Sequence, residues 1–179
     1  MERIVLTFGL ISSAILVTLM AILLSLVLSG GLNFEGSEVV GYATMVLSFI
    51  MVFFGIRSYR ENIGGGAITF GRAFKVGILI ALITCAVYVI AWQITYYNFM
   101  PDFMDRYAAI AIERMREKGA SDAEILKTTQ QMAHYKELYK NPLINIGITF
   151  LEVFPVGLIM TLVSAGILRK RTAEPAAAG

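Results

Sequence analysis

Four long apolar runs divide the chain, and most of the charged residues lie between them. The runs cover residues 5–28, 39–56, 76–96 and 143–168. A helix needs about 20 apolar residues to cross about 30 Å of hydrocarbon, and each run meets or approaches that length. Three runs contain no charged side chain, and the fourth contains one, Glu152. The pattern predicts an all-α integral membrane protein with four transmembrane helices in a bundle.

The composition supports this class. Hydrophobic residues make up 57% of the 179 positions and charged residues 16%, whereas a soluble domain is about half apolar and about a quarter charged. The net charge of +2 is too small to indicate a nucleic-acid partner, so the predicted partner is the lipid bilayer. One cysteine, Cys85, and one histidine, His134, argue against a His- or Cys-ligated metal centre within one chain. No cofactor is predicted.

The first apolar run follows a short basic start and could be mistaken for a secretory signal. Its 24 residues exceed the apolar region of a signal peptide, which has about 7–15 residues. We therefore interpret it as an uncleaved anchor.

The distribution of Lys and Arg predicts the orientation of the spans. Loop 29–38 has no basic residue, whereas the segment 57–75 carries four and residues 169–171 read Arg-Lys-Arg. Both termini are therefore expected on the cytoplasmic side of the membrane. The basic residues of the inner loop are predicted to contact anionic lipid headgroups: they are Arg57, Arg60, Arg72 and Lys75.

The segment 97–142 is then expected outside, although it holds seven basic residues; it also holds seven acidic ones. It is predicted to form a helical hairpin over about 101–140. Pro101 suits a first helical position, and Gly119 suits a helix terminator. Ser121 and Glu124 have the spacing of a capping box at the start of the second helix. Residues 1–171 are expected to form one domain, followed by a disordered tail at 172–179.

Glu152 is the most informative residue, because an ionisable group inside a span is costly and indicates function by default. Counting from Leu143 places it about 14 Å below the outer boundary. The side chains at similar depth in the other spans are Thr18, Ser48 and Thr84, with Tyr88 slightly above. These five residues are predicted to form one intramembrane polar layer. Glu152 would be either a protonated, hydrogen-bonded structural residue or part of a proton or cation site.

Small residues recur every four positions in three spans, which is typical of helix-packing seams in membranes. They lie at 73, 77, 81 and 85, at 157, 161 and 165, and at 9, 13, 21 and 25, where Val17 interrupts the series. The segment 64–72 is glycine-rich, but Arg72 and Ala73 replace the Lys and Ser/Thr of a phosphate-binding loop. We interpret it as a turn that precedes the third span, with Thr69 as its helix cap.

The whole layout resembles a bacterial membrane family catalogued as domain of unknown function 4199. The residues that carry the resemblance are Gly41-Tyr42, the run from Phe53 to Arg60, Gly65-Gly66, the run from Ile68 to Phe74, Gly77, and Pro155-Val156-Gly157. The resemblance covers about residues 4–171. It implies a bacterial inner-membrane protein and carries no assigned activity.

The sequence therefore favours a non-enzymatic structural or accessory subunit. It is expected to form a homo-oligomer or to bind a membrane-protein partner through the outer hairpin. The alternative is a small oligomeric transporter or channel that uses the polar layer around Glu152, since four spans are few for a transporter unless copies assemble. A membrane enzyme ranks lowest, because the spans contain no paired carboxylates, histidine cluster or nucleophile with a base.

Overall fold

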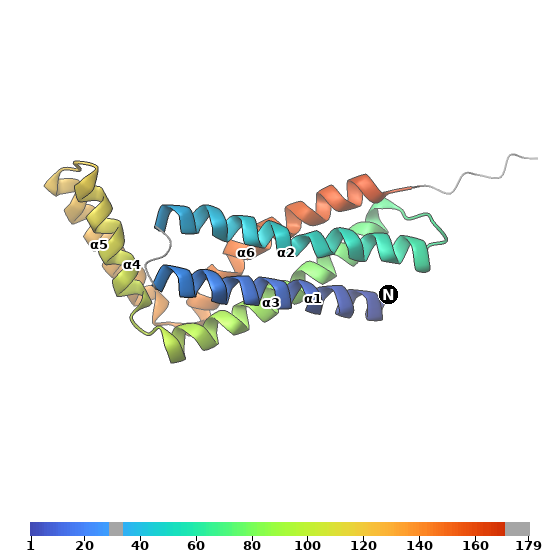
Figure 1. The fold of residues 1–179 in the computed structure, drawn as a ribbon, viewed down its shortest axis with the longest axis horizontal. Coiled ribbons are helices and arrows are strands. Elements are labelled where there is room, and N and C mark those ends of the chain that lie inside the picture. Colours follow the sequence, from blue (N-terminus) through green and yellow to red (C-terminus); the bar gives the residue numbers. More distant parts are fainter. Residues whose placement is uncertain (29–33, 171–179) are drawn as a thin grey trace, which may run out of the picture. The chain divides into compact units, whose positions relative to one another are not determined.

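A computed structural model describes residues 1–28 and 34–170 of the chain. These residues form six helices: α1 (Glu2–Leu28), α2 (Phe34–Asn62), α3 (Phe70–Phe99), α4 (Phe103–Glu117), α5 (Asp122–Tyr139) and α6 (Pro142–Leu168) (Figure 1). Four of them, α1, α2, α3 and α6, are long and apolar enough to cross a membrane. Helices α4 and α5 form a shorter pair between the third and fourth of these spans. The predicted all-helical membrane fold is confirmed.

The helices extend beyond the predicted apolar runs. Helix α2 begins at Phe34 and ends at Asn62, and α3 runs from Phe70 to Phe99. Residues 34–38 are therefore helical, although the sequence predicted a loop over 29–38; residues 29–33 lie outside the described residues, as does the predicted tail at 172–179. Hydrophobicity marks only the lipid-immersed part of a helix, because backbone hydrogen bonding continues through polar residues at its ends.

The chain divides into two compact units. The first contains Met1–Tyr88 and the residues from Glu152 onward, and the second contains Val89–Leu151. Helices α3 and α6 each contribute residues to both.

Small residues allow the helices of the first unit to approach one another closely. Gly9, Gly77 and Gly157 are buried, as are Ala81 and Ala165. A Cβ atom added at Gly157 would lie 2.9 Å from two ring atoms of Phe49 and 3.2 Å from Cβ of Ala81. Such contacts leave no room for a larger side chain, so the small-residue spacing of α3 and α6 marks real packing seams. At the far end of α1, by contrast, Ala21 and Ser25 are exposed.

The connection between α2 and α3 is a tight turn. Gly65 and Gly66 have φ angles of +59° and +84°, a backbone region that glycine adopts without steric cost. The hydroxyl oxygen of Thr69 accepts a hydrogen bond of 3.4 Å from the backbone N–H of Arg72, which confirms the predicted cap. Ile68 and Lys170 exchange two backbone hydrogen bonds of 2.9 Å. This short bridge ties the turn to the end of α6.

In the second unit, α4 and α5 lie side by side and are joined by a turn at Gly119, whose φ is +75° (Figure 1). The predicted terminator at Gly119 is confirmed. Pro101, predicted at a first helical position, lies in a turn two residues before α4 begins at Phe103. The capping box of α5 is present: the Ser121 hydroxyl accepts from the N–H of Glu124, and the Glu124 carboxylate accepts from the N–H of Ser121.

Candidate intramembrane polar sites

The residues of the predicted polar layer occupy two different environments. Ser48 and Thr84 are fully buried in the first unit, and Tyr88 is also buried. Thr18 and Glu152 are exposed on the surfaces of α1 and α6. The structure therefore does not assemble the five predicted side chains into one buried layer. Residues at equal depth can face any direction around their helices, because depth says nothing about rotation.

The buried hydroxyls of the first unit bond to backbone carbonyls. Ser12 donates to the carbonyl of Ser48 over 2.9 Å and so links α1 to α2. Ser48 donates to the carbonyl of Thr44 over 2.7 Å. Thr84 donates to the carbonyl of Ile80 over 3.0 Å, and its hydroxyl also lies 3.5 Å from the carbonyl oxygen of Gly9. These side chains fasten helices to one another and to themselves.

Glu152 lies on the side of α6 that faces away from this packing. Gly157, Thr161 and Ala165 are buried on the opposite side of the helix. In the described part of the chain, no hydrogen bond or ion pair involves the Glu152 carboxyl group. It lies ten residues into a 27-residue helix, about 15 Å along a length of about 40 Å. The group is therefore close to the middle of the span and accessible from outside the unit.

The second unit contains a polar cluster that the sequence prediction missed. Nε2 of Gln93 on α3 donates a 2.9 Å hydrogen bond to Oδ1 of Asn145 on α6. The hydroxyl of Thr149 lies 3.2 Å from the same oxygen and donates to the backbone carbonyl of Asn145 over 2.8 Å. Asn145 is fully buried, and its Nδ2 has no hydrogen-bond partner. This amide pair is a direct polar link between two spans.

The depth of Gln93 and Asn145 in the predicted spans is enough to predict that they pair. Gln93 lies three residues before the end of the predicted span 76–96, and Asn145 lies two residues after the start of the span 143–168. Both are therefore about 3–5 Å from the same predicted boundary. Buried amides, like ionisable groups, need a partner at their own depth in a span.

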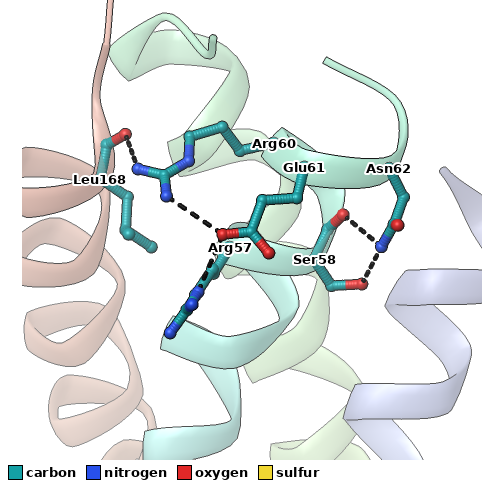
Figure 2. Close-up of polar contacts among 6 residues, drawn as sticks. All are labelled: Arg57, Ser58, Arg60, Glu61, Asn62 and Leu168. Atoms are coloured by element: carbon teal, nitrogen blue, oxygen red, sulfur yellow. Dashed lines mark hydrogen bonds and ion pairs between the residues drawn. The ribbon is translucent and has the colours of Figure 1, made fainter. Parts of the chain in front are cut away.

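Two of the predicted headgroup-contacting residues, Arg57 and Arg60, make hydrogen bonds within the protein. Figure 2 shows Arg60 directed at the end of α6, where Nη1 donates to the carbonyl of Leu168 over 3.4 Å. Its Nη2 and Nε of Arg57 both donate to Oε1 of Glu61, over 3.3 and 2.9 Å. Arg57 is exposed.

Two more cations remain exposed near the same turn. Arg72 and Lys75 project from the first turns of α3. A cavity of about 480 Å³ lies close by and is lined by Ile68, Thr69, Phe70 and Arg169. The exposed cations are available to anionic groups of a bilayer surface, and contact with headgroups stays a prediction.

Helices α4 and α5 and the residues beside them carry several ion pairs. Arg106 lies 2.7 Å from Asp102, and this hydrogen bond holds the pKa of the Asp102 carboxyl below its usual range. Lys136 of α5 pairs with Asp105 of α4, and that hydrogen bond raises the pKa of Lys136. Hydrogen bonds from the Ser121 backbone and side chain lower the pKa of Glu124.

Aromatic rings join this pair to the end of α3 within the second unit. The ring centroid of Tyr96 lies 6.4 Å from that of Phe103 and 5.8 Å from that of Tyr139. The ring centroids of Trp92 and Phe103 are 5.0 Å apart, and the two rings meet edge to face. Rings in such arrangements stabilise each other beyond their burial. They hold both helices of the pair against the third span.

Comparison with known proteins gives one match. The family described as protein of unknown function (DUF4199) matches residues 7–170, nearly the whole described chain. No curated protein and no solved structure matches. The match agrees with the resemblance seen in the sequence.

Proposed function

Because the chain belongs to the DUF4199 family, whose function is unknown, we propose its role from its own geometry. We infer that it is a non-enzymatic structural or accessory subunit of a membrane assembly. Four spans anchor it, and the α4–α5 pair provides a contact surface for another membrane protein.

The observation that carries the proposal is the use of buried polar side chains in the first unit. Ser12, Ser13, Thr84 and Thr161 donate to backbone carbonyls over 2.7–3.0 Å. All four bonds satisfy polar groups inside hydrocarbon. The Ser12 bond to Ser48 also joins α1 to α2, whereas the other three lie within one helix each. The close approaches at Gly77 and Gly157 give the same unit a tightly packed interior, which suits a scaffold.

The surface of α5 supports a contact role. None of its side chains is buried, and two large apolar ones, Leu126 and Tyr135, are 60% and 47% exposed. They are nine residues apart and therefore lie on opposite sides of the helix. Each offers a separate apolar contact point on an otherwise largely polar helix.

The contact role can be tested by purification of the tagged chain from its native membrane in mild detergent. We expect a companion protein at constant stoichiometry, retained by the matched polar variant Gln130→Ala/Gln131→Ala. The variant Leu126→Glu/Tyr135→Ala should lose it while keeping its helical circular dichroism. A chain that elutes without a companion, or a companion retained equally by both variants, would contradict the proposal.

The topology proposed with this role has both termini in the cytoplasm of a bacterium and the α4–α5 pair outside. The exposed basic residues near the α2–α3 turn support it, because such residues are enriched on the cytoplasmic side. Cysteine-reactive probes that do not cross the membrane test it. A cysteine introduced at Gln130 should react in intact cells, whereas one introduced at Lys75 should react only after lysis.

One observation favours the alternative of an oligomeric transporter. Glu152 is exposed near the middle of α6, where several copies could enclose it in a shared pathway. In that case proteoliposomes should show proton or cation flux that Glu152→Gln abolishes. A scaffold predicts no such flux for either form.

A further inference from the structure

One face of α6 has the pattern of a helix-pairing interface and is exposed in the described chain. We call it the α6 seam, and its residues are Glu152, Pro155, Ile159, Leu162 and Gly166. All five are exposed, with Ile159 at 59% and Leu162 at 43%. At 3.6 residues per turn they fall within about 80° of the helix circumference.

The spacing of the seam is that of a heptad repeat. Glu152, Ile159 and Gly166 are seven residues apart, and Pro155 and Leu162 occupy the intermediate positions. Side chains at such a and d positions form the contact line between two helices that cross at a small angle. A Cβ atom added at Gly166 would meet nothing within 4 Å, so this glycine is not needed for packing within the unit.

Hydrocarbon cannot satisfy the polar groups on this face. A carboxyl group in lipid is costly without a hydrogen-bonding partner, and charging it there costs more. Pro155 has no N–H, so the carbonyl of Leu151 also lacks its usual helical donor. A polar partner that approaches the exposed face of α6 would satisfy the Glu152 carboxyl group.

We propose that the α6 seam is the interface between two copies of this chain, in which the neutral carboxyl groups of the two Glu152 side chains hydrogen-bond to each other. A neutral carboxyl carries one donor and one acceptor. Two of them related by a twofold axis satisfy each other through a pair of hydrogen bonds. A lone Lys or Arg has donors only and could not do this.

A second copy matches the seam in depth as well as in chemistry. All copies insert with the same orientation, so the twofold axis of a dimer must lie along the membrane normal. The two α6 helices are then parallel, and each seam residue meets its own counterpart. A different protein would need a polar group at this particular depth, whereas a second copy always brings one. The dimer would form whether or not the α4–α5 surface binds another protein.

Disulfide cross-linking in liposomes tests the geometry, with Cys85→Ala as background so that each variant has one cysteine. Ile159→Cys places a thiol on the seam. Leu10→Cys on α1, which is 56% exposed in the native chain, places one at a similar distance from the same end of the unit. We expect mild oxidation to give covalent dimers of the first variant and at most a trace for the second. Equal cross-linking of both, or none of either, would overturn the proposal.

Substitution of Glu152 tests the chemistry in the same liposomes, with the dimer fraction followed as the protein-to-lipid ratio is varied. Glu152→Gln keeps a self-complementary amide, so its dimer constant should stay within about twofold. Glu152→Leu keeps the volume but no hydrogen bond, and should weaken the dimer about tenfold. Circular dichroism checks that both variants are folded. A dimer constant unchanged by Glu152→Leu, or lost equally with Gln and Leu, would refute the carboxyl pair.

Discussion

The hydrogen bond between Gln93 and Asn145 gives a sharp test of how polar groups hold the spans together. Replacing Asn145 with Leu removes the acceptor of the 2.9 Å bond and leaves the Gln93 amide unpaired. Thr149 keeps a partner, because it also donates to the backbone carbonyl of residue 145 over 2.8 Å. The loss is therefore confined to one amide. Replacing Gln93 with Leu leaves the Asn145 amide with one fewer partner in a fully buried position.

The expected magnitudes follow from these geometries. An interhelical hydrogen bond in a membrane contributes about 0.6 kcal/mol on average and up to about 1.7 kcal/mol, and an unpaired buried amide costs about 1–3 kcal/mol. Each single Leu variant should lower the free energy of unfolding by about 1–2 kcal/mol. The double variant removes both amides, including the Nδ2 that already lacks a partner. Its free energy of unfolding should therefore lie within about 0.5 kcal/mol of that of the native chain.

Unfolding in mixed micelles with increasing dodecyl sulfate, followed by circular dichroism, measures the four free energies of this double-mutant cycle. Thr161→Val is the control, because it removes one hydroxyl bond within its own helix and keeps the methyl group that packs beside Gly77. The interaction energy between the two amides should be about 1 kcal/mol or more. Additive single effects, with a coupling below about 0.3 kcal/mol, would refute the structural role of the pair.

Three further predictions concern packing, capping and pH. Gly157→Ala should lower the free energy of unfolding by about 1–3 kcal/mol, because the added methyl group overlaps its neighbours. Gly166→Ala lies in open space on the same helix and should raise the free energy of unfolding by up to about 1 kcal/mol through its higher helix propensity. The same micelle titration measures both variants. Ser121→Ala should destabilise α5 by about 1 kcal/mol, seen as faster amide hydrogen exchange in its first turn and unchanged exchange in the spans. The raised pKa of Lys136 means that its pairing with Asp105 stabilises fully below the ordinary lysine pKa and is lost as pH rises through the higher folded value. Near neutral pH, amide hydrogen exchange in α4 and α5 should therefore be slower in the native chain than in Lys136→Met. In strong alkali the two proteins should exchange at the same rate.

The sequence was sufficient to predict the helices and several of their ends, because those features depend on local chemistry. Hydrophobic length predicted the spans, and the Ser121–Glu124 spacing predicted a capping box that the structure contains. The four-residue spacing of small side chains on α3 and α6 also predicted their buried faces. Each of these signals is read within one helix.

The polar sites were harder to predict because they depend on how each helix is rotated. Depth can be counted along a span, and it placed Glu152, Thr18 and Ser48 at one level. Rotation is set by packing, which turned Ser48 inward and left Thr18 and Glu152 exposed. The spacing of small residues on α6 indicates how this helix is rotated. Gly157, Thr161 and Ala165 form its packing stripe, and at about 100° per residue Glu152 lies about 140–220° around the helix from them. Combining depth with this stripe would have placed the carboxyl outside.

Helix α6 thus carries two different contact surfaces. Its inner face packs closely against neighbouring residues at Gly157, where an added Cβ atom would lie 2.9 Å from the Phe49 ring. Its outer face retains a proline and a carboxyl group that contribute nothing to that packing and destabilise the span in lipid. A polar group that weakens an isolated subunit persists most simply where it strengthens an assembly, because the cost in the monomer is recovered when the group finds its partner. The exposed carboxyl is therefore better explained by what the chain assembles with than by how it folds.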